Sequence, residues 1–198
     1  MSKYNIDSPE KYSQLYKESV NDPEVFWSEL ASNNFLWEAK WSKVLDWDFR
    51  KAKVSWFKDA KLNITINCLD RHVKNHPDKT AIIFEPNNPN EEYKSYSYSE
   101  LLAEVCKMAN VLKLMGVKKG DRVCIYLPMI PELAFSVLAC ARIGAIHSVV
   151  FAGFSSNALA TRIDDCKSSI IITSDGSFRG EKILNIKKIV DDALEMCK

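Results

Sequence analysis

The chain has 198 residues, of which 46% are hydrophobic and 27% charged, a composition typical of a folded domain and not of a disordered chain. Lysine and arginine number 27 against 26 aspartate and glutamate residues, so the formal net charge of +1 offers no bulk field to recruit nucleic acid or an anionic membrane. No apolar run approaches the roughly 20 residues of a membrane span, and the N-terminus has no apolar signal-peptide core. We therefore expect a soluble, cytoplasmic protein.

Cysteine usage points to the same compartment. The six cysteines are widely scattered and include no C-x-x-C pair, which predicts reduced thiols in a cytosolic protein. Cys106, Cys124 and Cys140 lie in apolar stretches, where a thiol packs in the core and lacks the electropositive, accessible setting of a nucleophile.

Residues 1–66 hold all five tryptophans, separated by polar stretches with little sustained periodicity. Large aromatic side chains spread in this way are typical of an extension anchored on another surface. We expect an aromatic-rich N-terminal extension here and a second region from residue 67 onward.

From residue 67 the pattern alternates between helix and strand signals. Asn67 is expected to cap a helix that runs through His76, where Pro77 ends it. Residues 80–85 and 92–96 predict the strands of a hairpin, because the turn-rich residues 86–90 separate them. Ser97 and Glu100 then form a capping box that opens a helix with a 3.6-residue apolar stripe, which Gly116 ends.

The remaining elements follow in a regular order. Residues 123–127, 146–150 and 169–173 predict strands; residues 131–143, 156–165 and those from about 187 predict helices. Continuous apolar strands joined by helices favour an α/β fold in which helices cover a mostly parallel sheet.

Ligands bind at the carboxyl ends of strands in such sheets, so the loops after residues 127, 150 and 173 are the places to search. In the second loop Ala152, Gly153 and Phe154 could admit a flat ligand, although the residues alone favour a plain turn with Gly153 at positive φ and Ser155 or Ser156 as helix cap. In the third loop Arg179 and Lys182 could hold a phosphate, although a solvated loop at residues 174–182, with Glu181 partly cancelling the charge, remains the alternative.

Other chemistry finds little support. His72 and His76 are spaced for one helical face, but no third metal ligand cluster follows. His147 lies in an apolar strand, where a buried or packing imidazole is the expected role. The Walker, dinucleotide-binding, zinc-protease and hydrolase motifs are absent from the sequence, so neither catalytic nor metal-ligating residues are assigned.

Three stretches resemble the acetyl-CoA synthetase family, which belongs to the adenylate-forming enzymes. They are Asn-Cys-Leu-Asp-Arg-His at residues 67–72, Tyr-Leu-Pro-Met-Ile-Pro-Glu at 126–132, and Leu-Ala-Cys-Ala-Arg-Ile-Gly-Ala-Ile-His-Ser-Val-Val-Phe-Ala-Gly-Phe-Ser at 138–155. The resemblance implies that residues 1–66 are the N-terminal extension of that family and residues 67–198 the first part of its AMP-binding domain.

By this resemblance, the full enzyme is an acid–thiol ligase that uses ATP and Mg²⁺ to convert acetate to acetyl-adenylate and pyrophosphate, after which CoA displaces AMP. Arg179 and Lys182, with Gly180 between them, would hold the 3′-phosphate of CoA, and Ala152, Gly153 and Phe154 would border its adenine. Some relatives have glycine in place of Ala152 and arginine in place of Lys182; loss of the bidentate donor weakens phosphate binding.

The resemblance also implies that the phosphate loop, the acyl pocket and the catalytic lysine lie beyond residue 198. We therefore expect these 198 residues alone to supply part of the CoA site and to be inactive. A propionyl-CoA synthetase portion and a non-catalytic CoA-binding module are the alternatives. An incomplete sheet would also expose an apolar edge, which predicts self-association.

Overall fold

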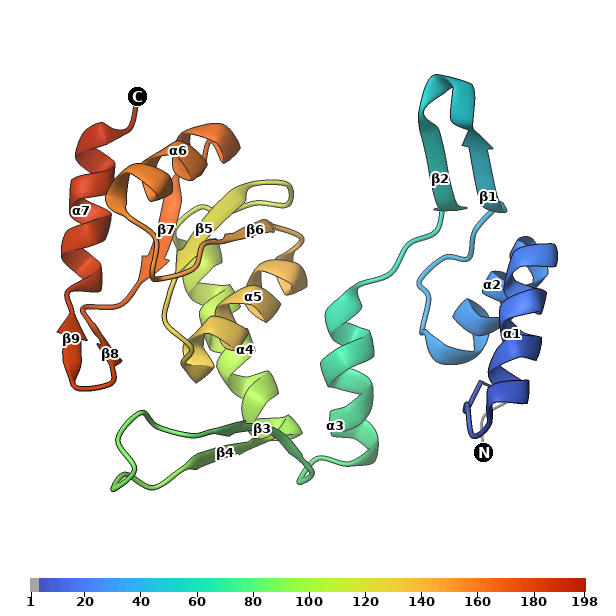
Figure 1. Cartoon of the computed structure of the whole chain (residues 1–198), viewed down its shortest axis with the longest axis horizontal. Coiled ribbons are helices and arrows are strands. Elements are labelled where there is room, and N and C mark those ends of the chain that lie inside the picture. Colours follow the sequence, from blue (N-terminus) through green and yellow to red (C-terminus); the bar gives the residue numbers. More distant parts are fainter. Residues whose placement is uncertain (1–3) are drawn as a thin grey trace. The chain divides into compact units, whose positions relative to one another are not determined.

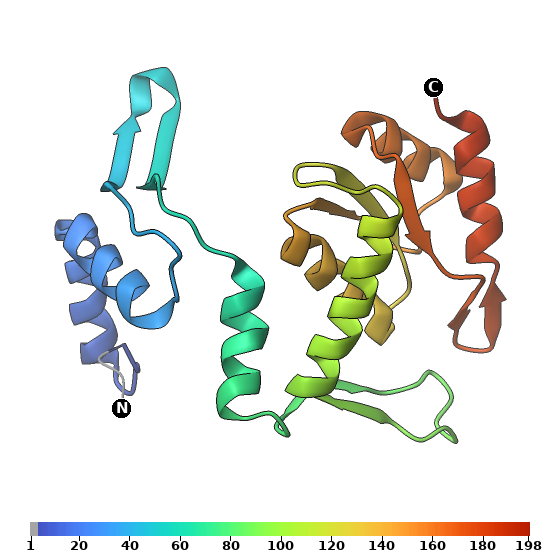
Figure 2. The same cartoon turned by 180° about the vertical axis from the view of Figure 1, so that it is seen from behind.

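The computed structural model describes residues 4–198. These residues fall into two compact units, which divide between Asn67 and Cys68. Figures 1 and 2 show the elements of both units from opposite sides. The helices of the first unit are α1 (Pro9–Asn21) and α2 (Pro23–Asn34), and its strands are β1 (Lys43–Asp48) and β2 (Lys53–Lys58), joined by the short 3₁₀ turn η1 (Phe49–Lys51).

Local signals explain why α1 and α2 begin where they do. The Ser8 side chain accepts a hydrogen bond from Lys11 N at 3.1 Å, and the Asp22 side chain accepts one from Val25 N at 3.4 Å. Proline follows each cap at the first helical position, where its missing N–H costs nothing. Neither helix was expected from hydrophobic periodicity, although both cap-and-proline pairs are visible in the sequence.

Aromatic contacts within the first unit involve each of its tryptophans. The antiparallel hairpin β1–β2 pairs Leu45 with Trp56. The rings of Trp37 and Trp41 have centroids 5.1 Å apart, and Phe57 lies 4.8 Å from Trp41. The extension is therefore rich in aromatic contacts of its own; the prediction that it is anchored on another surface stays a prediction.

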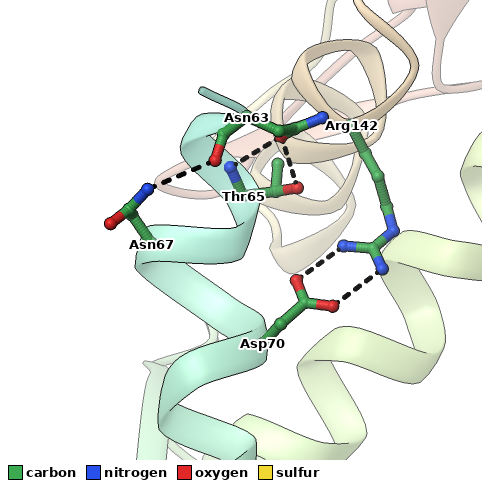
Figure 3. Close-up of polar contacts among 5 residues, drawn as sticks. All are labelled: Asn63, Thr65, Asn67, Asp70 and Arg142. Atoms are coloured by element: carbon green, nitrogen blue, oxygen red, sulfur yellow. Dashed lines mark hydrogen bonds and ion pairs between the residues drawn. The ribbon is translucent and has the colours of Figure 1, made fainter. Parts of the chain in front are cut away.

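The helical segment before residue 76 differs from the expectation for Asn67. A helix-like segment begins near residue 64, where Asn63 Oδ1 accepts hydrogen bonds from Thr65 N and Thr65 Oγ1, and continues through a π-helical turn, η2 (Ile66–Asp70), into α3 (Arg71–Asn75). Asn67 is buried within this segment, and its amide bonds the N–H and C=O of Leu36. The prediction that Asn67 caps the helix was wrong, because its side chain bonds the distant backbone of Leu36 instead. Its Nδ2 also donates to the nearby Asn63 carbonyl at 3.4 Å (Figure 3).

The strands of the second unit are β3 (Thr80–Phe84), β4 (Lys94–Ser97), β5 (Arg122–Tyr126), β6 (Ile146–Val149), β7 (Ile170–Thr173), β8 (Ser177–Arg179) and β9 (Lys182–Leu184). Its helices after α3 are α4 (Tyr98–Leu114), α5 (Pro131–Ile143), α6 (Ser156–Cys166) and α7 (Ile186–Met196). The predicted hairpin is present as β3–β4, and the capping box of Ser97 and Glu100 opens α4. The predicted α/β fold is confirmed.

A parallel sheet in the order β6-β5-β7 forms the centre of this unit. The side chains of β5 alternate between two cores, and nearly all are fully buried. Val123 and Ile125 pack with α4 and α5, whereas Cys124 and Tyr126 pack with α6 and α7. Helices thus cover both faces of β5, as an apolar run without alternation indicates.

One ion pair ties α5 to the end of the π-helical turn. The Arg142 guanidinium donates from Nη1 and Nη2 to the two carboxylate oxygens of Asp70, at 2.8 and 2.9 Å (Figure 3). The two side chains are 27% and 33% exposed, respectively. The paired guanidinium lowers the pKa of Asp70 mainly through this hydrogen bonding, against an opposing effect of burial.

Candidate functional site

Three loops leave the parallel sheet at the carboxyl ends of its strands. Within it, Ile125 is in register with Val149, and Tyr126 with Thr173. Because the carboxyl ends of parallel strands lie together, the segments that follow β5, β6 and β7 all leave from this end of the sheet. Both groups of predicted CoA-site residues lie on these segments.

Hydrogen bonds from the end of β5 and within the turn itself fix the loop after β6. The Tyr126 hydroxyl, at the end of β5, donates a 2.6 Å hydrogen bond to the Phe154 carbonyl, and Phe154 N bonds Phe151 O at 3.0 Å. Ala152 is buried against the α6 and α7 core. The Ser155 side chain then accepts from Ala158 N as the N-cap of α6. The turn is therefore ordered by a buried tyrosine that composition alone did not single out.

Gly153 is needed for a close approach and not for its backbone angle. Its φ is outside the left-handed region, so the expected positive φ was wrong. A Cβ added at Gly153 would lie 2.4 Å from Cε1 of Phe151, closer than real contacts allow. Any larger residue would have to displace the exposed Phe151 ring.

Phe154 presents a partly exposed ring, 40% accessible, at the same turn. The guanidinium carbon of Arg162 lies 4.7 Å from the centroid of that ring, within the range of a cation–π contact. Phe151 meets Phe154 nearly perpendicularly, with centroids 5.8 Å apart. Gly153 and Phe154 are thus exposed at this turn, with a cation beside the Phe154 ring, whereas Ala152 is buried in the core.

Residues 174–182 do not form the loop that was expected, because they contain most of the antiparallel hairpin β8–β9. Arg179 and Lys182 are directly paired across its two-residue turn. Gly180 has φ +60, which a two-residue hairpin turn with glycine first requires. Directly paired residues project from the same face of a hairpin, so the two cations lie side by side, and Glu181 occupies the turn between them.

Two like charges placed opposite each other destabilise a hairpin unless something binds between them. Within residues 4–198, neither Arg179 nor Lys182 forms an ion pair with a carboxylate. The turn is held from outside by Asn87, whose Nδ2 donates to Gly180 O at 3.0 Å. Asn87 belongs to the turn-rich segment between β3 and β4, and nothing in the sequence indicates this contact across 93 positions.

The two predicted groups remain separate clusters in the structure. Ala152, Gly153 and Phe154 share one turn, and Arg179, Gly180 and Lys182 share another. No hydrogen bond or ring contact joins the two turns within the described chain. Both segments follow strands of the same parallel sheet and leave it at the carboxyl ends of those strands.

The thiols and histidines carry no site of their own. None of the six cysteines forms a disulfide within the described residues, and burial raises the pKa of Cys124 and of Cys140 to about 11. Cys106 is only half-buried, so its assignment to the core was wrong. His147 is exposed on β6 and not buried, because β6 has a neighbour on one side only, and His72 stacks on Tyr98 with centroids 4.9 Å apart.

Residues 4–198 contain no group of three or more histidine, cysteine or carboxylate side chains placed to hold a metal ion. In the same residues, no helix is both long enough and apolar enough to cross a bilayer.

Comparison with known proteins divides the chain at nearly the same place as its two units. Residues 12–68 match the acetyl-coenzyme A synthetase N-terminus family, and residues 69–196 match the AMP-binding enzyme family. The chain is 52% identical over 188 residues to acetyl-coenzyme A synthetase of Magnetococcus marinus, and 54% identical over 192 residues to that of Leptospira biflexa.

These alignments cover 95% and 96% of this chain but 29% of each relative, so the chain spans less than a third of the length of the relatives it matches. The match to the AMP-binding enzyme model alone extends over more than half of the 198 residues. The chain belongs to the AMP-binding enzyme family, as an N-terminal portion similar to that of acetyl-coenzyme A synthetases.

Proposed function

We propose that the chain is the N-terminal portion of an AMP-forming acetate–CoA ligase and that it contributes part of the CoA site. The single observation that carries the CoA assignment is the pair of cations on one face of the β8–β9 hairpin, Arg179 and Lys182, without carboxylate partners in the described chain. The identity of about 50% to acetyl-coenzyme A synthetases supports acetate as the acid.

The residues present fit the two ends of CoA's nucleotide. A planar guanidinium binds a phosphate through two parallel hydrogen bonds, and an ammonium adds a point charge. Arg179 and Lys182 would hold the 3′-phosphate, and Gly180 between them keeps the turn narrow. Ala152, Gly153 and Phe154 would border the adenine, for which the partly exposed Phe154 ring offers a flat surface.

In the whole enzyme, ATP and Mg²⁺ would convert acetate to acetyl-adenylate, and the CoA thiol would then displace AMP. This chain's residues would bind and orient CoA for that second step. We assign residues 1–66 to the N-terminal extension and residues 67–198 to the start of the AMP-binding domain, supported by the division of the fold after Asn67 and of the family matches after residue 68. The six cysteines, none of which forms a disulfide in the described chain, support a cytoplasmic location.

Calorimetric titration of CoA and of 3′-dephospho-CoA into the 198-residue chain tests the site. We expect CoA to bind more tightly than dephospho-CoA. Arg179→Gln should weaken CoA binding about tenfold, since a charge-assisted hydrogen bond is worth about 1.5 kcal/mol and 1.4 kcal/mol is a factor of ten. It should also reduce the difference between the two ligands, of which Lys182 would keep a part.

Arg50→Gln is the matched control, because Arg50 is an exposed arginine of the first unit. It should leave both affinities unchanged, whereas Lys182→Arg should preserve or tighten CoA binding by adding a bidentate donor. Equal binding of CoA and dephospho-CoA, or equal losses in Arg179→Gln and Arg50→Gln, would show that these residues are scaffold and not part of a CoA site.

We also propose that the isolated chain self-associates through β6. This strand pairs with β5 alone within the described sheet, and its Ile146 and Val149 side chains are 54% and 49% exposed. An exposed apolar edge strand is a template for pairing with another chain. Sedimentation should detect concentration-dependent dimers that Val149→Lys reduces; a monomer at every concentration would contradict the proposal.

A further inference from the structure

A basic cleft outside the proposed CoA site lies where α4 and α5 end. Its volume is about 540 Å³, it is open to solvent, and residues of α4, α5 and the turn that follows α4 line it. Four cations line it, Lys113, Lys118, Lys119 and Arg142, and no carboxylate does. The polar lining is completed by Asn110 and Cys106. The cleft is defined by these six side chains, and all of them belong to the second unit.

The three lysines supply the net charge of this cleft. Arg142 is held by both oxygens of Asp70, which offset its charge. Lys113, Lys118 and Lys119 form no ion pair within residues 4–198. The nearby Asp121 carboxylate is engaged with the turn itself, where its Oδ2 accepts from Lys118 N at 2.7 Å. The Asp121 carboxylate keeps its charge near Lys118, but no carboxylate within residues 4–198 forms an ion pair with any of the three lysines.

A common role for lysines at helix ends is to bond the last carbonyls, and here that role is largely filled by the backbone. In α4, the Val111, Leu112 and Lys113 carbonyls accept from Met115, Val117 and Gly116. In α5, the Cys140 and Ala141 carbonyls accept from Ala145 and Gly144. The ammonium groups are thus available to a ligand.

The geometry of Gly144 places one of these lysines over the cleft. Gly144 has φ +76 and ends α5. A Cβ added there would come within 3.0 Å of Lys119 Cγ, so the absence of a side chain lets the Lys119 stem pack against the backbone. Gly120 N bonds Gly144 O at 2.9 Å, which ties the lysine-bearing turn to α5.

We propose that this cleft binds a compact multivalent anion of the inorganic polyphosphate class. Three lysines that line one cleft suit a ligand that carries several negative charges close together. A singly charged ligand would leave most of the repulsion among the three ammonium groups in place. Ala109, Val117 and Ile143 form an apolar floor, which offers no acceptor that would compete for the ammonium groups.

Cys106 provides a probe inside the cleft. Its thiol is half-buried, and it faces Arg142, whose pKa is raised mainly by Asp70 and additionally by Cys106. Tripolyphosphate is the ligand to use, at low salt, with alkylation of each cysteine followed by peptide mass spectrometry. We expect tripolyphosphate to slow the alkylation of Cys106 several-fold and to leave Cys166, a half-buried thiol of α6, unchanged as the internal reference.

The double variant Lys113→Gln with Lys119→Gln should need about 2- to 30-fold more tripolyphosphate for the same protection, because each of the two exposed ion pairs that it removes contributes about 0.2 to 1 kcal/mol. Lys107→Gln is the matched control, since Lys107 also lies on α4 but pairs with Glu104 outside the cleft. Arg179→Gln should leave the protection of Cys106 unchanged, which separates this site from the proposed CoA site. Unchanged alkylation of Cys106, or equal protection in the double variant and Lys107→Gln, would overturn the proposal.

Discussion

The ion pair between Asp70 and Arg142 offers the sharpest test of how the second unit is held together. In Asp70→Asn the amide can accept only one of the two guanidinium hydrogen bonds, at 2.8 and 2.9 Å, and the carboxylate charge is lost. Exposed ion pairs contribute about 0.2 to 1 kcal/mol, and breaking a fully buried pair costs about 3 to 5 kcal/mol. With side chains 33% and 27% exposed, we expect a loss of about 1.5 kcal/mol in the free energy of unfolding.

The pH dependence of this loss follows from the direction of the Asp70 pKa. The folded-state pKa is lowered from 3.8, so the pair contributes in full above the unfolded-state pKa and its contribution disappears as pH falls through the folded-state value. The difference between wild type and Asp70→Asn should therefore be the same at pH 7 and pH 5.5. It should shrink below about pH 4, the ordinary range of an aspartate.

Urea unfolding followed by far-ultraviolet circular dichroism is the assay, because all five tryptophans lie in residues 1–66 and their fluorescence would report the first unit alone. Asp78 is an exposed carboxylate that forms no ion pair within residues 4–198, so Asp78→Asn should change stability by less than about 0.5 kcal/mol. In a double-mutant cycle with Arg142→Gln, we expect a coupling energy of about 1 kcal/mol. Additive single-mutant effects, or a loss that persists unchanged to pH 3, would refute the reasoning.

Three further outcomes are expected. Ser97→Ala removes the hydrogen bond that the Ser97 side chain accepts from Glu100 N in the capping box of α4, and it should cost about 1 kcal/mol of stability. A change below about 0.3 kcal/mol in urea unfolding would contradict this expectation. Tyr126→Phe removes the 2.6 Å hydrogen bond to the Phe154 carbonyl and should cost about 1 to 2 kcal/mol, with a weaker affinity for CoA in the same calorimetric titration; unaltered stability would show that the turn does not depend on this hydroxyl. Cys124 and Cys140, with pKa values raised to about 11, should resist alkylation in the native protein at pH 8, where about one thiol in a thousand would be ionised. Rapid native-state modification of either cysteine, measured by peptide mass spectrometry, would argue against their burial.

Much of the second unit could be predicted because its signals agree at several levels. For α4, the capping box, the apolar stripe and Gly116 all indicate the same helix, and the structure has it at Tyr98–Leu114. Pro131 and Gly144 bound α5 in the same way. β5 is apolar on both faces because helices cover both sides of it.

The errors arise where a distant partner decides the outcome. Asn67 has the residue type of a helix cap, but the backbone of Leu36 takes its hydrogen bonds. Residues 177–184 are too short and polar to show strand periodicity, and their hairpin is recognisable only from the glycine turn. His147 occupies an apolar strand that proves to be an edge, and the number of neighbours of a strand is not a local property.

For the candidate site, the sequence located both turns but not what holds them. Gly153 was noted as permissive in φ, whereas its role is to leave room for the Phe151 ring. Tyr126 and Asn87, which bond the two turns, were not singled out, since a tyrosine in an apolar strand and an asparagine in a turn carry no mark of their distant acceptors.

The order of strands in the parallel sheet also has a consequence for synthesis on the ribosome. β5 is complete at Tyr126 and its first partner, β6, at Val149, but its second partner, β7, ends only at Thr173. At a translation rate of about 5 to 20 residues per second, the nascent chain leaves one side of β5 open for about one to five seconds after β6 is available. Over that interval a stalled or slowly translated chain would expose to chaperones a strand whose residues 123–126 are fully buried in the folded protein. Synonymous codons between residues 150 and 173 would then affect the yield of folded protein without changing a single side chain.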